Sequence, residues 1–288
     1  MDDSVPRKYS ADKIALLGLL VISLLAARLL TGARTIRPLK AGSQQIARLK
    51  SEGLDSILDK QDWELYFLIR DTEGKLVGFS SETFERAPTD SEAAITSNGH
   101  FYRRIPYFQQ SLVWFECDNS LDSFRLEGQS RMAGARPILI EVALDKAGKV
   151  TAKSSDSDPQ LTFQAEQGSV PEYLIERIAV EATLGTEANV VLNVIGNDGT
   201  KDVVVVSTKK TPARQSRMGG TGRTVEIHSP EKQYTIQVVL DSADRIVRIQ
   251  HEGVFILERA AREDIIRRFG EGVRFVPDRN DLPAPDAI

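Results

Sequence analysis

The residue types that most often carry chemistry are few in this sequence and lie far apart. The three histidines, His100, His228 and His251, show no spacing typical of metal ligands. His228 and His251 end predicted strands, where a surface histidine is the ordinary interpretation. The single cysteine, Cys117, continues the apolar side of a predicted strand, so we expect a buried structural thiol rather than a nucleophile.

The short sequences that resemble catalytic or ligand-binding motifs are better explained as turns and linkers. The Gly-rich run at 219–223 lacks the Gly-Lys-Ser/Thr ending of a phosphate-binding loop. Acidic clusters at 118–122 and 156–158 fit no complete calcium-binding pattern. We therefore predict no catalytic, cofactor-binding or metal site, no cofactor and no enzyme. An active site assembled from distant loops leaves no local trace, so an enzyme stays an alternative.

The longest apolar stretch lies near the N-terminus and predicts a membrane anchor. Residues 14–27 are followed by Arg28 and two more leucines. A helix of about 17 residues rises roughly 25 Å, a little short of a hydrocarbon core, and Arg28 can reach the headgroups. We expect a transmembrane helix over residues 14–33, with these residues in the bilayer: Leu16, Leu20 and Leu24. Candidate headgroup contacts are Arg28, Arg34, Arg37 and Lys40.

Two alternatives for this stretch stay open. One is a cleavable signal peptide, with a basic start and the small residues Thr31 and Ala33 before a possible cut; the other is a buried core helix. The basic residues after the stretch would place the large domain in the cytoplasm by the positive-inside rule. Because long domains translocate largely regardless of charge, we instead predict a single-pass membrane protein with most of the chain extracytoplasmic or periplasmic.

Charge and length restrict the partners. The formal net charge of −4 argues against nucleic acid, which binds basic surfaces. The predicted partners are the lipid bilayer and either an envelope protein or a lipophilic ligand. Beyond the anchor, the 288-residue chain is long enough for one large or two small domains.

Changes in periodicity divide the chain. We predict a short polar tail (1–13), the anchor (14–33), an amphipathic stalk helix (34–62), a main β-rich domain (63–208), a basic Gly-rich linker (209–223), a second hairpin-and-helix unit (224–277) and a disordered tail (278–288). The stalk repeats apolar residues at helical spacing, although Gly53 weakens its middle. The stalk packs on the domain or serves a partner or the membrane surface.

The fold class predicted for the remainder is α+β. From Trp63 onward, short stretches of period two alternate with polar turns, which predicts a mainly antiparallel sheet with helices covering one face. The hairpin sequences at 140–150 and 236–246 match each other, and each is followed by a predicted helix, at 172–178 and 263–269. This similarity suggests two hairpin-plus-helix repeats, although any hairpin with an Asp-led turn would look alike.

Aromatic residues are frequent along the predicted strands. Along 64–70 and 112–117 both strand faces are apolar, which suggests that the sheet is covered on both sides. Helices of the domain, a partner or a lipid in a groove could form the second cover. Candidate groove residues are Trp63, Tyr66, Phe79, Phe101 and Trp114.

The Trp-Glu-Leu-Tyr-Phe sequence at 63–67, the Lys-Leu-Val-Gly-Phe sequence at 75–79 and the hairpins that end in helices resemble the periplasmic lipoprotein-carrier family. The resemblance covers roughly residues 63 to 276. It implies a curved antiparallel half-barrel with helices over an apolar concave face. A fixed anchor departs from a shuttling carrier, so transport does not follow.

Three hypotheses for function follow. The first is a membrane-anchored, non-enzymatic interaction or scaffold module of the cell envelope. The second is a lipid- or lipoprotein-binding half-barrel, and the third is an enzyme with a non-local active site. A filled core with a free sheet edge would favour the first, a purely apolar pocket the second, and a pocket with converging His, Asp or Glu the third.

Overall fold

Alternating apolar and polar side chains produce the strands of a single large sheet. The computed structural model describes residues 39–86, 94–103, 109–132, 136–186, 189–210 and 222–271, with Val273 and Phe275. Side chains at 39–41, 94–103, 109–110, 131–132, 157–159 and 210 lie outside this description. Residues Lys40–Ile288 form one compact unit.

Helices are a minor part of the described chain. They are α2 (Ser43–Glu52), α3 (Leu54–Gln61), the 3-10 helix η2 (Glu172–Leu174), α4 (Ile175–Ala182) and α5 (Arg262–Phe269). The strands are β1 (Leu39–Ala41), β2 (Glu64–Arg70), β3 (Leu76–Arg86), β4 (Ala94–Arg103), β5 (Gln109–Asp118), β6 (Phe124–Met132), β7 (Ile138–Leu144), β8 (Lys149–Ser154), β9 (Ser157–Gln164), β10 (Val170–Pro171), β11 (Asn189–Ile195), β12 (Lys201–Lys210), β13 (Arg223–Ser229), β14 (Tyr234–Leu240), β15 (Ile246–His251) and β16 (Phe255–Arg259). The α+β class with a mainly antiparallel sheet is confirmed.

The sheet follows the order β1-β11-β12-β13-β14-β15-β16-β2-β3-β4-β5-β6-β7-β8-β9, and the short β10 pairs with β11 in parallel. From β11 to β9 along this order, neighbouring strands pair in antiparallel fashion. Strand β16 pairs with β2, and β12 pairs with β13. Segments 63–208 and 224–277, which the sequence divides, therefore contribute to one sheet.

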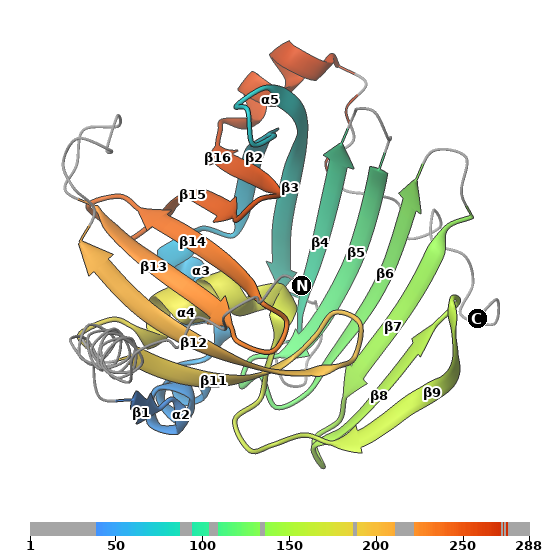
Figure 1. The fold of residues 1–288 in the computed structure, drawn as a ribbon, viewed down its shortest axis with the longest axis vertical. Helices are drawn as coiled ribbons and strands as arrows, with labels where there is room; N and C mark the ends of the chain where they lie inside the picture. Colours follow the sequence, from blue (N-terminus) through green and yellow to red (C-terminus); the bar gives the residue numbers. More distant parts are fainter. Residues whose placement is uncertain are drawn as a thin grey trace, which may run out of the picture. The chain divides into compact units, whose positions relative to one another are not determined.

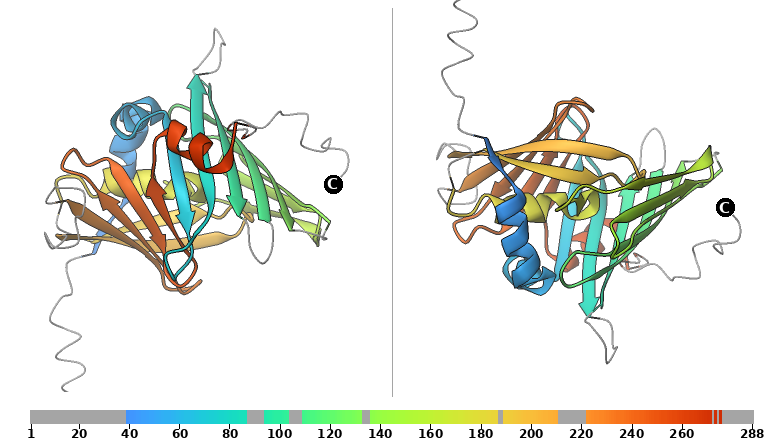
Figure 2. Two further views of the ribbon diagram at one scale, coloured as in Figure 1. Left: turned by 90° about the horizontal axis from the view of Figure 1, so that it is seen from above. Right: turned by 90° about the horizontal axis from the view of Figure 1, so that it is seen from below.

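The sheet curls until its two ends meet. The turn between β11 and β12 reaches β8, because a Cβ atom at Gly199 would lie only 2.0 Å from the Cβ atom of Ala152. Lys201 Nζ in β12 lies 4.8 Å from the ring centroid of Phe163 in β9. Figures 1 and 2 show the curved sheet wrapping around α4. The curl therefore encloses a helix and leaves an interior in which a site can form.

Helix α4 is the centre of the main core. Ile175, Ile178, Ala179 and Ala182 are at most 1 % exposed and pack with apolar side chains from both halves of the sheet. The helix is also tied to the helices before the sheet, because Lys60 Nζ lies 3.1 Å from Glu181 Oε2. Helix α4 is therefore held both by the sheet and by α3.

Within the helix predicted at 34–62, the described residues form the short strand β1 and then two helices, which are separated at Gly53. Gly53 has φ +84°, and its N–H donates to Leu49 O, which closes α2. Asn119 holds the start of α3 in place. Its side-chain oxygen accepts a hydrogen bond from Asp55 N at 2.9 Å, and its carbonyl oxygen accepts one from Leu54 N. The predicted apolar face is correct: Ile46, Leu49, Leu54, Ile57 and Leu58 are buried against the sheet.

The expectation that helices cover one face is wrong, because α5 lies on the other face. Leu68 and Phe79, paired across β2 and β3, form a second cluster with Ile265 of α5 and with Phe275. Leu65 and Phe67, on the alternate side of β2, belong to the main core. Covering on both sides of β2, as its apolar residues predict, is confirmed; α5 lies apart from α4 in Figure 1.

The two matching hairpins do share one turn. Asp145 Oδ1 accepts from Ala147 N and Lys149 N, and Asp241 Oδ1 accepts from Ala243 N and Arg245 N. However, the helices after the hairpins pack on opposite faces of the sheet, α4 in the main core and α5 in the second cluster. The similarity is therefore that of a turn, and the hairpin-plus-helix unit is not repeated.

Several predicted features fall outside the described residues. These are the anchor with Leu16, Leu20 and Leu24, the headgroup candidates Arg28, Arg34 and Arg37, the side chain of Lys40, and the tail at 278–288. Within the described part of the chain, no helix combines the length and the apolar character that crossing a bilayer requires.

Candidate functional site

A cavity of about 250 Å³ lies inside the curled sheet, beside the start of α4. Its walls come from β2, β3, β5, β14, β15 and β16, from η2 and α4, and from the turn at Asn197. Half of its lining residues are apolar; they are Leu65, Phe67, Val113, Tyr173, Ile175, Ile236, Ile246, Ile249 and Leu257. The cavity therefore has apolar walls drawn from distant parts of the sequence.

Strand alternation explains the lining residues of β2 and β5. Leu65 and Phe67 lie two residues apart and face the interior, whereas Leu68 faces α5. Strand β15 departs from the rule: Ile246 and Ile249 both line the cavity although they are three residues apart. The register between β14 and β15 shifts between Val239 and Leu240, and this irregularity brings both isoleucines to one side.

Charged residues meet at the end of the cavity where α4 begins. Among the lining residues described, Arg177 is the only Lys or Arg, and it is 2 % exposed. Its Nη2 atom lies 2.7 Å from Glu82 Oε2, and its Nη1 donates to Asp62 O at 2.9 Å. Its guanidinium also lies 4.7 Å from the ring centroid of Phe84. These contacts already engage the positive charge of Arg177.

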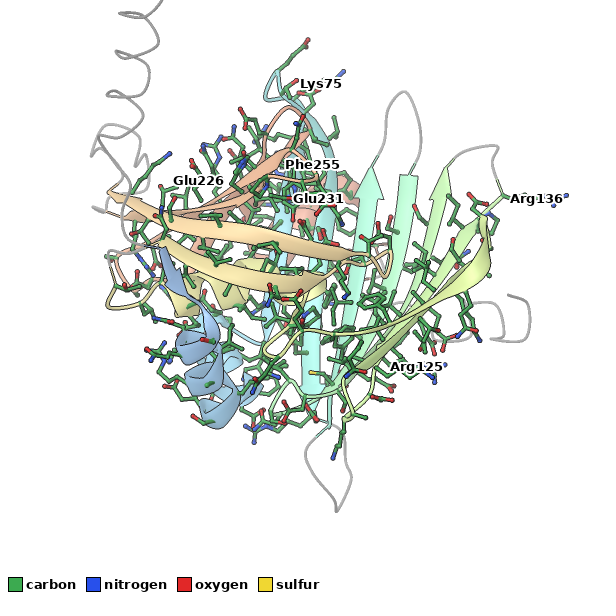
Figure 3. The ribbon with its side chains drawn as sticks, turned by 60° about the horizontal axis from the view of Figure 1, so that its bottom comes forward. Lys75, Arg125, Arg136, Glu226, Glu231 and Phe255 are labelled. Carbon is green, nitrogen blue, oxygen red and sulfur yellow. The ribbon has the colours of Figure 1, made fainter. Side chains whose placement is uncertain are left out.

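Two further carboxyl groups face the cavity from one side of η2 and α4. Glu172 Oε2 accepts a hydrogen bond from Asn197 N at 2.7 Å, which ties the start of the helix to the β11–β12 turn. Glu176 lies four residues later, one helical turn along, where its oxygen Oε1 is 4.0 Å from His251 Nε2. The ring of His251 lies against that of Phe255 at a tilt of 42°, with centroids 4.5 Å apart (Phe255 is labelled in Figure 3).

Burial changes the proton affinity of this pair. Burial, followed by the repulsion of Glu82 and Glu172, raises the pKa of Glu176 to about 8. Burial alone lowers the pKa of His251 to about 4. At neutral pH the pair is therefore mainly a neutral carboxylic acid beside a neutral imidazole. The acid can donate a hydrogen bond to a ligand, and the imidazole can donate or accept one.

The groove residues suggested by the sequence do not assemble into this cavity. Trp63 Nε1 donates to Asp59 Oδ1 at 2.8 Å, and Tyr66 and Phe79 pack beside Phe275 in the second cluster. Trp114 lies on the face of β5 opposite to the cavity-lining Val113. The side chain of Phe101 lies outside the described part. None of the four described side chains lines the cavity.

One feature of the sequence could have identified two cavity residues that were not predicted. Glu172 and Glu176 are four residues apart, so two like charges lie on one side of the predicted helix. His251 had no such signal, since a strand end predicts a surface position, whereas its side chain is 28 % exposed and lines the cavity. The described residues contain no cluster of three potential metal ligands.

Comparison with known protein families and with curated proteins finds no match to this chain. Among solved structures, it is similar to a β-barrel-like protein of the domain of unknown function DUF1849 from Brucella abortus. The TM-score is 0.48 at 13 % sequence identity, and the alignment covers 68 % of this chain and 94 % of the other. The resemblance to the lipoprotein-carrier family therefore stays a prediction.

Proposed function

We propose that this protein is a non-enzymatic ligand-binding module of the cell envelope that holds a small, mainly apolar molecule. The observation that carries the proposal is the cavity of about 250 Å³, half of whose lining residues are aliphatic or aromatic, with charged residues gathered where α4 begins. Concave, largely apolar sites with a few convergent polar groups are typical of small-molecule binding. The cavity favours the ligand-binding hypothesis over a scaffold, for which a filled core would be sufficient.

The size of the cavity restricts the ligand. Its volume of about 250 Å³ corresponds to about eight water molecules at about 30 Å³ each. It lies just below the range of about 300–1,000 Å³ for pockets that hold drug-sized molecules. A complete membrane lipid would therefore project beyond the cavity, and we expect a shorter molecule or only one end of a lipid to enter it.

Native mass spectrometry of the full-length chain released from detergent, combined with solvent extraction, tests this proposal. We expect a co-purifying small molecule on the parent and on Val203→Trp, which alters an exposed residue of β12. The matched variant Val113→Trp places the same bulk in the cavity and should lose the molecule. A clean apo mass for the parent, or equal retention by both variants, would contradict the proposal.

An acid–base enzyme is the second candidate function. It is favoured by the convergence of Glu82, Glu172, Glu176 and His251, because a carboxyl group with a pKa near neutrality suits proton transfer. Incubating the extracted molecule with the protein distinguishes the two functions. Recovery of the molecule unchanged supports binding, whereas a product that disappears with Glu176→Gln supports catalysis.

We further propose that residues 14–33 hold the chain in a membrane, with the cavity on the extracytoplasmic side. The support for the anchor is the apolar run, and the support for the orientation is that long domains translocate largely regardless of charge. The full-length chain should resist extraction by alkaline carbonate and should be cleaved by protease added to spheroplasts. Release by carbonate would contradict the anchor, and protection from protease would contradict the orientation. Crosslinking in those membranes would then identify any envelope protein partner.

A further inference from the structure

We infer that the cavity selects a positively charged ligand, a protonated amine on a short apolar body, with Glu176 as its counter-ion. This inference rests on the proposed ligand-binding function and names the class of ligand. It is carried by the side chains that meet at the polar end of the cavity, three carboxyl groups and one guanidinium that other groups already hold.

The contacts of Arg177 argue against an anionic ligand. Arg177 lies against Glu82, donates to Asp62 O and places its guanidinium over the ring of Phe84. Because Arg177 is the only Lys or Arg among the described lining residues, no free cation among them remains to bind a carboxylate or phosphate. A carboxylate entering the cavity would instead meet Glu82 and Glu172. Like charges in a site of low dielectric constant repel strongly, so the cavity should reject a fatty acid.

The surroundings of Glu176 suit an ammonium group. The charged or titratable groups that face it are Glu82 of β3, Glu172 of η2, Arg177 of α4, His251 of β15 and Tyr234 of β14. Arg177 is the only permanent cation among them, and it is bound to Glu82. The Tyr234 hydroxyl donates to Asp202 Oδ2 at 3.2 Å. A second positive charge beside Glu176 would therefore be attracted by the carboxylates of Glu176 and Glu172, while Glu82 is already paired with Arg177.

Binding of an ammonium ion should release a proton. Without a ligand, burial raises the pKa of Glu176 to about 8, so its carboxyl group holds a proton at pH 7. A cation within about 4–6 Å stabilises the carboxylate and lowers this pKa. The bound state is then an ammonium–carboxylate pair, and the proton of Glu176 passes to the buffer. A neutral ligand of the same length would leave that proton in place.

Calorimetric titration of the full-length chain at pH 7 tests the inference with three probes of equal length: hexylammonium, 1-hexanol and hexanoate. We expect hexylammonium to bind at least about tenfold more tightly than hexanoate. Repeating the titration in buffers of different ionisation enthalpy should show close to one proton released per hexylammonium bound and none for hexanol.

Two variants localise the effect. Glu176→Gln should weaken hexylammonium about tenfold and abolish the proton release, while hexanol binding stays unchanged. Glu231→Gln, in the exposed β13–β14 turn (labelled in Figure 3), should behave like the parent. Circular dichroism of Glu176→Gln establishes that it is folded, and hexanol binding by that variant reports an intact cavity.

The outcomes separate this inference from the proposal on which it rests. If none of the three probes binds, the ligand-binding function itself fails. If hexanol or hexanoate binds as tightly as hexylammonium, ligand binding stands and selection for a cation is overturned. Tight binding of hexylammonium without proton release, or with Glu176→Gln unaffected, would overturn the role of Glu176.

Discussion

Glu176 is an ionisable carboxyl group in surroundings that disfavour its charged form. Its place on α4 buries it beside an apolar cavity, while Glu82 and Glu172 lie on the same side of it. A carboxyl group in such surroundings keeps its proton, because removing the proton would create an unpaired charge in a site poor in water. At neutral pH the side chain of Glu176 is therefore mainly a neutral carboxylic acid.

The first prediction concerns the stability of Glu176→Gln as a function of pH. Because the folded protein keeps the proton of Glu176 up to about pH 8 and the unfolded chain loses it near pH 4.5, the parent loses stability as pH rises through this window. A tenfold difference in proton affinity corresponds to about 1.4 kcal/mol. Urea unfolding should show Glu176→Gln more stable than the parent by roughly 3 kcal/mol at pH 7 and by less than about 1 kcal/mol at pH 5. An equal difference at both pH values would contradict the raised pKa.

His251 provides a second prediction, of opposite sign. The unfolded chain binds a proton at His251 below about pH 6.5, whereas the folded protein does so only near pH 4, so the parent loses stability as pH falls between these values. From pH 7.5 to pH 5, the free energy of unfolding should fall by about 2 kcal/mol more for the parent than for His251→Gln. His228→Gln, at an exposed position on β13, is the matched control and should follow the parent.

At the scale of elements, one ion pair joins α4 to the sheet. Arg177 is 3 % exposed in its side chain and lies 2.7 Å from Glu82 of β3. Removing one member of a buried pair typically costs about 3–5 kcal/mol, because the other charge stays buried without a partner. We expect that loss for Arg177→Met in chemical unfolding, and a smaller loss for Arg177→Met combined with Glu82→Gln.

The matched control for this pair is Arg125→Met. Arg125, which is labelled in Figure 3, lies on the outer face of β6 beside Glu127 and Glu141. Its side chain is 43 % exposed. Exposed pairs contribute about 0–1 kcal/mol, so this variant should lose little stability. Equal losses for Arg125→Met and Arg177→Met would show that burial does not set the strength of the α4 contact.

The contact between the two ends of the sheet gives a fourth prediction. Gly74 and Gly199 occupy the same place in two Asp-containing turns, with φ +83° and +77°. A Cβ atom at Gly74 would meet nothing within 4 Å, whereas at Gly199 it would lie 2.0 Å from Ala152 Cβ. Gly74→Ala should cost about 1 kcal/mol through its positive φ alone. Gly199→Ala should cost at least about 2 kcal/mol more in thermal or chemical unfolding, since the sheet must shift.

At the scale of the whole molecule, the C-terminal strands pair with strands from earlier in the chain and complete the sheet. Strand β16 pairs with β2, and β13 and β14 supply Val225, Ile227, Ile236 and Val238 to the main core. A chain that ends at residue 208 would leave the paired edges of β2 and β12 open and would expose much of α4. We predict that such a chain fails to form a soluble monomer in size-exclusion chromatography and lacks a near-ultraviolet circular dichroism signal.

Co-expression of residues 224–288 should restore folding to that truncated chain, because the missing strands can pair without a covalent link. A soluble, folded monomer of the truncated chain alone would contradict this prediction. It would also mean that 63–208 is an independent domain, as the change of sequence pattern suggests.

Local sequence was sufficient for the elements. The period-two stretches at 64–70 and 138–144 form strands, and the apolar spacing of Ile46, Leu49 and Leu58 identifies the buried side of α2 and α3. Turns led by Asp71, Asp145 and Asp241 form as their residue types require, since the side-chain oxygen accepts from the backbone two and four residues later. These features depend on neighbours in the chain, so a sequence contains them.

The candidate site depended on neighbours that are distant in the chain. Glu82, Glu176 and His251 meet only because β16 pairs with β2 and the sheet curls around α4, and neither event has a local signal. Of the aromatic residues suggested as a groove, Tyr66 and Phe79 pack under α5, Trp63 packs against the main core and Trp114 lies on the outer face of β5. The sequence by itself determined the strands, the turns and the buried helix faces, because short-range periodicity and hydrogen bonding decide them. Only the tertiary structure decided which polar side chains share a cavity, because strand pairing over long sequence separations brings them together.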